Sequence, residues 1–511
     1  MAQKCYLSGL FDGSDFNIMS SPVLDLFSGF VQIDRQSVQP IYLQVAQQVI
    51  NAVQRGYLMV GTKLPGSRAL SERLHVHRKT VIAIYNELEA QGWVEVRPNK
   101  GTFIIHQQQL LKLEKPYAKL VSLAQYPSQT GYDFRKSTVL DSPFESTESD
   151  FYFSDGTPDI RLTQLQNLSR LYTASLKRKT TLKRMTQLHQ DGSAYFKEQL
   201  SNYLNFSRGL HISKSNVLIT RSVEMSLYII SRILITQGDK VLVGELSLFS
   251  ANMVFQRLGA KVLTVPVDEQ GLNVEYISEN FRTGELRMVY ITPRHHYPTT
   301  VTLSAQRRIA LLQLAREYGF VIVEDDYDGD FLYEQSTVMP LASADVDGMV
   351  VYVGSFGKSL APTFRTGFVV APDNLMVEMR KYLGIIDRQG DVIMEHALGE
   401  MIEEGEIHRH LKKSLKVYRE RRDYFCDILE TEFKDIVSFQ RPTGGLAVWT
   451  TWNNNISLFK LANNCLPKGL FIPQNLLYQN KKLAAMRLGF GHLNESEIEQ
   501  SLTVLKNAVF L

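Results

Sequence analysis

Residues 350 to 371 read VVYVGSFGKSLAPTFRTGFVVA, and the interpretation of the whole chain starts from this stretch. β-Branched residues fill the run from Val350 to Val353, small residues make a turn, and a second apolar run begins at Gly367. Lys358 therefore stands between two strands that we expect to be buried. Scarce water lowers the pKa of a lysine ammonium, which suits an amine that forms an imine with an aldehyde.

The residues around Lys358 could bind the other groups of an aldehyde cofactor. Ser355 and Arg365 flank it and supply a hydroxyl and a guanidinium for a phosphate group. Upstream, the apolar run 320–324 predicts a buried strand that ends at Asp325 and Tyr327. A carboxylate at a strand end can pair with a protonated pyridine nitrogen, and a phenol nearby can reach a ring hydroxyl. A surface lysine is the alternative, but the set predicts a site for pyridoxal 5'-phosphate.

The second half of the chain predicts an α/β fold. Near-continuous apolar strands that alternate with helices such as 223–236 and 304–318 indicate a buried, mostly parallel sheet. Ligands collect at the carboxyl ends of such strands, where we expect Ser222, Asp325 and Lys358. A long helical segment, 399–432, leads to a smaller α+β portion. The seven strand candidates are 217–220, 241–243, 261–265, 288–292, 320–324, 350–354 and 367–371.

The amino-terminal part has the pattern of a DNA-binding domain. Apolar residues recur every four positions in 41–53, and two further helices, 68–74 and 78–91, are separated by a short turn, as in a helix-turn-helix. The hairpin of 93–105 predicts a wing. Seven Lys/Arg against four Glu in 61–105 leave a surplus of three cations. The alternative is a winged helix used for protein contact. The expected DNA-contacting residues are Arg68, Arg78, Lys79, Thr80, Arg97 and Lys100.

Four motifs carry a family resemblance. They are EDDYDGDF at 324–331, GSFGKSLAP at 354–362, TPRHHYPTT at 292–300 and RLGF at 487–490. The region from 151 resembles a fold-type-I aminotransferase domain, and the whole chain resembles the MocR branch of the GntR regulators. The resemblance implies a GntR-type winged helix-turn-helix at 37–106 and an aminotransferase-like, effector-binding domain at 151–511. Between them, the polar segment 107–150 has only scattered apolar residues, so we expect a linker there, with a few short helices packed on the following domain as the alternative. It also implies pyridoxal phosphate, a homodimer and paired half-sites in promoter DNA.

By motif position, the resemblance places Ser222 and Val223 in the turn that binds the cofactor phosphate, and Leu248 over the pyridine ring. It places Arg487 where a ligand carboxylate is received, with a structural ion pair as the alternative. Several positions depart from the family pattern. His77 stands where similar proteins usually have a serine that caps the recognition helix. Glu224 replaces a glutamine beside the phosphate, where a carboxylate is repulsive unless it turns away or pairs with a cation such as Arg221. Leu248 replaces a stacking tyrosine.

Length and composition set outer limits. A chain of 511 residues is too long for one core, and a net charge of +3 is too small to indicate nucleic acid by itself. Three scattered cysteines, Cys5, Cys426 and Cys465, lack metal-ligand spacing and fit a reducing compartment. No apolar run approaches membrane-spanning length. The expected location is therefore the cytoplasm.

Three function classes follow. The first is a DNA-binding transcriptional regulator whose aminotransferase-like domain holds pyridoxal phosphate and senses an amine, an amino acid or the cofactor itself. The second is an aminotransferase with an accessory DNA-binding domain. The third is a regulator whose degenerate, cofactor-free domain is a scaffold, which Glu224 and Leu248 favour. The first is preferred, with no residue assigned a catalytic role and at most a residual transamination half-reaction.

Overall fold

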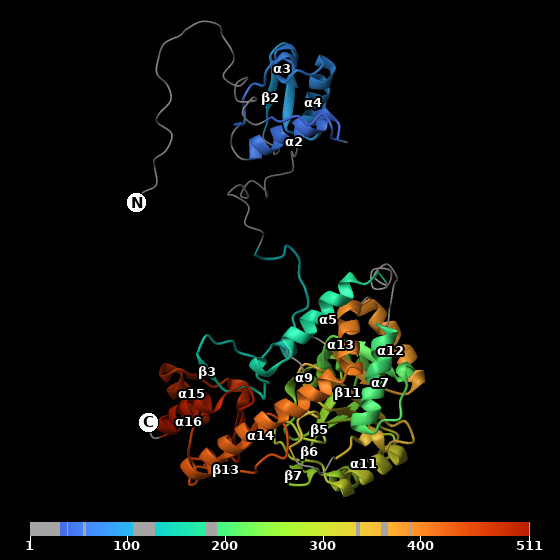
Figure 1. The fold of residues 1–511 in the computed structure, drawn as a ribbon, viewed down its shortest axis with the longest axis vertical. Coiled ribbons are helices and arrows are strands. Elements are labelled where there is room, and N and C mark those ends of the chain that lie inside the picture. Colours follow the sequence, from blue (N-terminus) through green and yellow to red (C-terminus); the bar gives the residue numbers. More distant parts are fainter. Residues whose placement is uncertain are drawn as a thin grey trace. The chain divides into compact units, whose positions relative to one another are not determined.

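The computed structural model describes residues 31–37, 39–54, 58–105, 128–179, 192–333, 338–358, 366–388 and 390–509. The chain divides into two compact units, Met1–Phe134 and Arg135–Leu511. Figure 1 colours the first unit blue, and the second runs from cyan to red.

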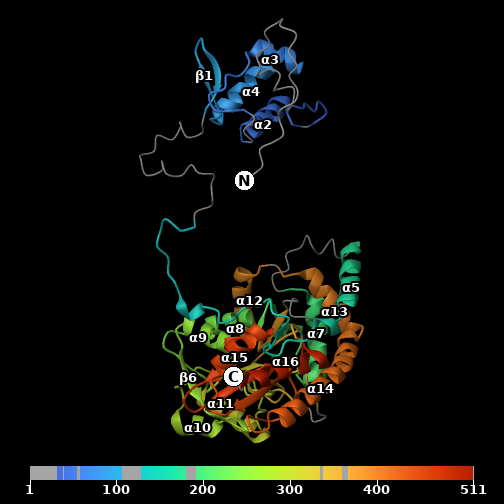
Figure 2. The same cartoon turned by 90° about the vertical axis from the view of Figure 1, so that its left-hand side faces the viewer.

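The first unit contains a winged helix-turn-helix (Figure 2). The helices α3 and α4 are separated by residues 75–77, and β1 pairs antiparallel with β2, with Arg97 opposite Gly101. Leu70, Val81, Ile84 and Leu88 are buried against α2 because they recur on the inner faces of the two later helices. The element bounds are α2 Ile41–Gln54, α3 Ser67–Leu74, α4 Arg78–Ala90, β1 Val94–Arg97 and β2 Gly101–Ile104.

The start of α4 is capped by a histidine. His77 precedes the helix in an extended conformation, and its Nδ1 accepts a hydrogen bond from the backbone N–H of Lys79 at 3.1 Å. The loss of such a cap costs a helix about 1 kcal/mol of stability. The imidazole thus takes over the capping role, which requires a neutral ring with Nδ1 unprotonated.

The second unit is built on a seven-stranded sheet with the order β4-β12-β11-β10-β9-β5-β6. All neighbours run parallel except β12, which is antiparallel to both β11 and β4. Every one of the seven predicted strands is present, and the predicted fold class is confirmed. The bounds are β4 Val217–Thr220, β5 Lys240–Gly244, β6 Lys261–Val265, β9 Met288–Ile291, β10 Val321–Asp325, β11 Val350–Ser355 and β12 Gly367–Val370.

Helices cover both faces of this sheet and shelter its apolar strands (Figure 1). On one face α8, α9 and α12 pack on residues such as Val323 and Val351. On the other face α10 and α11 form one cluster, and α7 and α13 form another around Tyr352 and Phe368. The bounds are α5 Leu165–Lys177, α7 Ala194–Arg208, α8 Val223–Leu234, α9 Phe249–Arg257, α10 Val274–Asn280, α11 Ala305–Tyr318 and α12 Asp373–Ile386.

The segment 399–432 is two helices, so the prediction of one continuous helix is wrong there. The helix α13 (Val392–Glu403) ends before Gly405, whose φ of 70° is left-handed, and α14 (Glu406–Glu432) begins after it. Glycine adopts that conformation without the steric cost that other residues bear. α14 joins two cores, because Ile407 lies with the sheet helices and Phe425 lies with the carboxyl-terminal portion.

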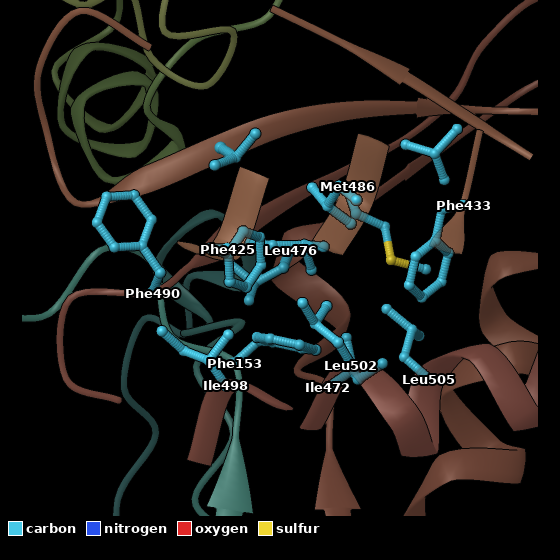
Figure 3. Close-up of a cluster of buried hydrophobic side chains, with 14 of the residues drawn as sticks. Phe153, Phe425, Phe433, Ile472, Leu476, Met486, Phe490, Ile498, Leu502 and Leu505 are labelled. Atoms are coloured by element: carbon cyan, nitrogen blue, oxygen red, sulfur yellow. The ribbon is translucent and has the colours of Figure 1, made fainter. Parts of the chain in front are cut away.

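The carboxyl-terminal portion has its own antiparallel sheet, with the order β13-β14-β17-β16. Its core, drawn in Figure 3, holds Phe153 and Met486 together with residues of α14 and α16. Phe153 reaches this core because β3 (Phe151–Tyr152) pairs with β15 (Leu470–Phe471). The other bounds are β13 Val437–Phe439, β14 Ala447–Trp452, β16 Leu477–Gln479, β17 Ala484–Gly489, α15 Leu458–Cys465 and α16 Glu495–Val509.

Residues 135–150, the last part of the segment predicted to be a linker, belong to the second unit. A short 3-10 helix, η2 (Thr138–Leu140), packs against α9. The Phe144 ring meets the Phe249 ring edge-on at 5.0 Å between centroids, and Glu145 accepts a hydrogen bond from the backbone of Gln474. This part of the segment is therefore attached at the amino end of α9.

None of the helices in the described ranges is long and apolar enough to cross a membrane.

Candidate functional site

Several strand ends of the large sheet meet at one edge. Ser355, which ends β11, lies opposite Gly367, and Gly367 lies opposite Thr220, which ends β4. A Cβ on Gly367 would lie 2.7 Å from Thr220 Oγ1 and 2.8 Å from the carbonyl carbon of Ser222. The absent side chain thus lets the start of α8 approach Ser355. The neighbouring strand β10 ends at Asp325, beside Val353 of β11.

Asp325 is a buried carboxyl that retains one free oxygen. Its Oδ2 accepts a hydrogen bond from the Tyr290 hydroxyl at 2.7 Å, whereas its Oδ1 has no hydrogen-bond partner among the described residues. Burial raises the pKa of Asp325 to about 7; the Tyr290 hydrogen bond opposes this shift, and the charge of Glu224 adds to it. A protonated ring nitrogen placed at Oδ1 would satisfy the oxygen and favour its ionised form.

Lys358 lies in the turn after β11, where its side chain is half-buried. Its Nζ lies 4.6 Å from the centroid of the Tyr327 ring. Burial lowers the pKa of the Lys358 ammonium, and the carboxylates of Asp328, Asp155 and Asp325 partly oppose that shift. A larger fraction of this amine is therefore unprotonated near neutral pH than of an exposed lysine amine.

Tyr327 and Arg487 lie on the same side of the site. The Tyr327 hydroxyl donates to the carbonyl of His295 at 3.0 Å and lies 3.4 Å from Arg487 Nη2. Arg487, on β17, is 1% exposed, and its Nε donates to Asp155 Oδ1 at 2.7 Å. Arg487 therefore already holds a carboxylate of the chain itself.

A buried histidine and a buried aspartate form a close pair near Lys358. His295 Nδ1 lies 2.9 Å from Asp328 Oδ1, while His295 Nε2 and Asp328 Oδ2 have no hydrogen-bond partner in the described ranges. Although burial acts in the opposite direction, His295 and Lys358 hold the pKa of Asp328 below its usual range. Burial lowers the pKa of the neighbouring His296 to about 3, so that ring is neutral at physiological pH.

The start of α8 has the form expected of a phosphate-binding turn. Ser222 is its N-cap, with Oγ accepting from the N–H of Met225 at 3.2 Å, and Val223 is the first helical residue. Unpaired amides and the helix dipole favour an anion at such an end. The Glu224 side chain is exposed, and Arg221 pairs with Asp387 at 2.7 Å. The ion pair of Arg221 is therefore with Asp387 instead, while the charge of the exposed Glu224 still acts on buried Asp325.

Leu248 directly precedes the first residue of α9. It lines a narrow cavity with Gly244, Tyr290, His296 and Tyr297. An apolar side chain can cover a ring there without aromatic stacking. Arg365, the other expected phosphate ligand, lies outside the described residues.

The expected DNA-contacting cations lie on the surface of the first unit. Arg68, Arg78 and Lys79 are exposed on α3 and at the start of α4, with Thr80 half-buried beside them. Arg78 Nε donates to Ser67 Oγ at 3.2 Å. At the wing, Lys100 is exposed at the tip, and Arg97 pairs with Glu95 at 2.9 Å and lies over the Phe103 ring. This arrangement presents a helix start and a wing tip to a duplex.

Four residues of the site were not predicted from the sequence. Asp155 pairs with Arg487 from 332 positions away, and Tyr290 reaches Asp325 from the adjacent strand. The buried pair of His295 and Asp328 was missed because its two members lie 33 positions apart in the chain. The acidic run after β10 was the one local signal for Asp328.

Two family models match the chain. The model described as bacterial regulatory proteins, gntR family, matches residues 41–104, and the model described as aminotransferase class I and II matches residues 159–497.

Similar proteins were found among both regulators and enzymes. The uncharacterized HTH-type transcriptional regulator YisV of Bacillus subtilis is 24% identical over 474 residues, covering 92% of this chain and 96% of that protein. The probable rhizopine catabolism regulatory protein MocR of Rhizobium meliloti is 27% identical over 425 residues, covering 81% and 82%. The kynurenine aminotransferase of Pyrococcus horikoshii, solved with PMP, superposes with a TM-score of 0.64 at 25% identity, covering 71% of this chain and 91% of that one.

Proposed function

The chain belongs to the MocR subfamily of GntR-type regulators, because a gntR domain precedes a class I and II aminotransferase domain, and we propose that it is a transcriptional regulator that senses a small amine. The aminotransferase family depends on pyridoxal phosphate. In this proposal the aminotransferase-like domain binds that cofactor and an amine or amino acid, or responds to the cofactor itself. The winged helix-turn-helix binds promoter DNA.

The observation that carries the proposal is the position of Lys358. Its amine, with a pKa lowered by burial, lies 4.6 Å from the Tyr327 ring and belongs to the same chain as a DNA-binding domain. The free Oδ1 of buried Asp325 and the start of α8 at Ser222 also fit the cofactor, as a partner for its ring nitrogen and for its phosphate. A cofactor-free scaffold does not require the amine of Lys358, the free oxygen of Asp325 and the helix start at Ser222 in one site.

When bound, pyridoxal phosphate supplies an aldehyde carbon that joins one primary amine or another. Lys358 is the protein's own amine at that position. Asp325 would hold the proton on the ring nitrogen, Tyr327 would lie at the ring hydroxyl, and Leu248 would cover one face of the ring. Ser222, Val223, Ser355 and Arg365 would hold the phosphate, which keeps the ring fixed while the amine changes.

We propose that a change at the ligand site is transmitted toward the DNA-binding domain through the start of α9. Leu248 lines the site, the next residue, Phe249, begins α9, and Phe249 contacts Phe144. Residues that follow the DNA-binding domain in the chain are thus attached one residue from the site. A ligand that moves Leu248 would bias the arrangement of this segment and so the presentation of the DNA-binding domain. The regulator is proposed to act as a homodimer on paired half-sites, in the cytoplasm with the DNA.

An aminotransferase with an accessory domain is the second candidate. It is favoured by the same lowered pKa, because an unprotonated Lys358 amine can accept a proton from a ligand. The engagement of Arg487 with Asp155 disfavours turnover of amino acids, since the guanidinium is not free for a substrate carboxylate.

The test is a comparison of DNA binding with and without ligand. The affinity for promoter DNA is measured for the wild type and for Lys358→Ala, each in the presence of excess pyridoxal phosphate, before and after addition of a panel of primary amines and amino acids. The proposal expects at least one of them to change the wild-type affinity and to leave that of Lys358→Ala unchanged. Equal responses in the two proteins, or steady turnover of an amino donor and a keto acid with no effect on DNA binding, would contradict it.

A further inference from the structure

Each nitrogen of the Arg487 guanidinium already has an oxygen of the protein as a partner. Its Nε donates to Asp155 Oδ1 at 2.7 Å, its Nη1 donates to the carbonyl of Pro298 at 2.9 Å, and its Nη2 lies 3.4 Å from the Tyr327 hydroxyl. The Tyr297 ring lies against it at 5.1 Å. A carboxylate forms its strongest contact with arginine through two parallel N–H groups. The Nε side of the guanidinium is held by Asp155, so a carboxylate that binds side-on through Nε and Nη2 must displace Asp155.

Asp155 is held in place by the residues around it. Phe153, two positions earlier, is fully buried in the core of Figure 3, as is Met486, which precedes Arg487. Ser154 accepts the N–H of Gly489 at 2.9 Å through its carbonyl, so this segment is attached to the strand that carries Arg487. Gly156 follows with a φ of 81°, which a residue with a side chain seldom adopts. The ion pair therefore joins two rigid elements.

The charges around the Lys358 amine are mostly negative. Among the described residues, the carboxylates of Asp328, Asp155 and Asp325 favour its charged form, and the guanidinium of Arg487 opposes it. Asp328 is 3% exposed, and its Oδ2 has no hydrogen-bond partner within the described part of the chain. The Asp155 side chain is 28% exposed, so it also faces solvent at the site. A cation entering here gains from these charges, whereas an added carboxylate is opposed by them.

We propose that the effector of this site is a primary amine without a carboxylate, and that Asp155 occupies the place on Arg487 that the carboxylate of an amino acid would take. This inference rests on the proposed function and narrows it to one ligand class. An amine whose far end is neutral or positive leaves the Asp155–Arg487 pair intact. An amino acid must break a buried ion pair and place its own charge beside Asp155.

The test uses pairs of ligands that differ by one carboxylate. Ethylamine is compared with alanine, and butylamine with 5-aminopentanoate, on the full chain loaded with pyridoxal phosphate. Dissociation constants come from the change in the cofactor's visible absorption and from the shift in melting temperature. In the wild type each amine is expected to bind at least about tenfold more tightly than its partner acid.

The variant Asp155→Asn tests whether Asp155 causes the preference for amines over amino acids. The neutral amide no longer holds the guanidinium as an ion pair, so the affinity for alanine and 5-aminopentanoate is expected to rise by about tenfold, while that for the amines changes less than about threefold. Asp150→Asn is the matched control, because it removes an exposed carboxylate from the same segment, five residues earlier. It is expected to bind all four ligands like the wild type.

The outcomes separate this inference from the proposed function. If the wild type binds the acids as tightly as the amines, or binds neither kind although the cofactor band is present, the inference is overturned and the cofactor site stands. If Asp155→Asn keeps the wild-type melting temperature and the wild-type preference, Asp155 is not its cause, and the inference is overturned as well. If the protein never acquires the cofactor band, the proposed function itself fails.

Discussion

The amine of Lys358 lies 4.6 Å from the centroid of the Tyr327 ring, although 31 positions separate the two residues in the chain. β10 and β11 run parallel and side by side, so the turns that follow them meet at one edge of the sheet. Asp325 ends one of these strands and Ser355 ends the other. The predictions below follow from this shared edge.

Asp325→Asn is expected to abolish retention of the cofactor and to stabilise the cofactor-free protein above pH 7. Burial raises the pKa of this carboxyl to about 7, whereas an unfolded aspartate titrates near 3.9. The stability linked to its protonation is present below about pH 4 and is lost as the pH rises through 7, a cost of up to about 4 kcal/mol. Melting temperatures of the two proteins between pH 4 and 8 measure this. A difference that does not vary with pH would contradict the assignment.

Asp328→Asn is expected to shift the pH dependence of cofactor attachment to lower pH. The carboxylate of Asp328 favours the charged form of Lys358, so its removal lowers the pKa of that amine further. The cofactor's visible absorption is followed as a function of pH. Asp435→Asn, an exposed carboxyl in the same unit, is the matched control. A midpoint that stays at the wild-type pH would show that Asp328 does not act on Lys358.

Phe144→Ala is expected to weaken the effect of the ligand on DNA binding. An edge-on aromatic pair contributes about 1 kcal/mol, so the ligand-induced change in DNA affinity falls by up to about fivefold. The affinity for the ligand itself changes less than about twofold, since Phe144 is not among the residues that line the cavity at Leu248. Phe459→Ala removes another partly exposed phenylalanine and serves as the control. If ligand changes the DNA affinity of Phe144→Ala as much as that of the wild type, the contact between Phe144 and Phe249 does not transmit the effect of the ligand.

Arg78→Ala is expected to weaken promoter binding and to reduce the slope of log affinity against log salt by about one. The side chain is exposed at the amino end of α4, where phosphates and base edges are met. Lys416→Ala removes the same charge from an exposed position on α14 and should leave both quantities unchanged. Identical salt slopes for Arg78→Ala and the wild type would remove this arginine from the contact surface.

Much of the fold was predictable from local sequence. The strands are buried on both faces, so each appears as a short run of apolar residues, and the DNA-binding helices follow a regular spacing. The resemblance read from the four motifs is confirmed by the two family matches. The break at Gly405 was missed because an apolar pattern continues on both sides of it, and only the left-handed φ of 70° ends α13 there.

The site was predictable where a strand end carries its residue, as for Asp325, Tyr327 and Lys358. Contacts between distant segments left no such signal. The partner of Arg487 comes from the entry to the second unit, and the partner of Arg221 is Asp387, not Glu224. The first pair depends on the packing of the segment after β3 against β17, and the second depends on the packing of α8 against α12. Spacing within one segment records neither.

The most direct test of the central claim is the visible absorption of the purified protein after incubation with pyridoxal phosphate and removal of the excess. The wild type is expected to retain a cofactor band, and borohydride is expected to fix the cofactor covalently to the peptide that contains Lys358. Lys358→Ala is expected to lose the band and to bind non-specific DNA within about threefold of the wild type, since phosphate contacts of the first unit are untouched. A colourless wild type, or a Lys358→Ala variant that keeps the band, would contradict the account.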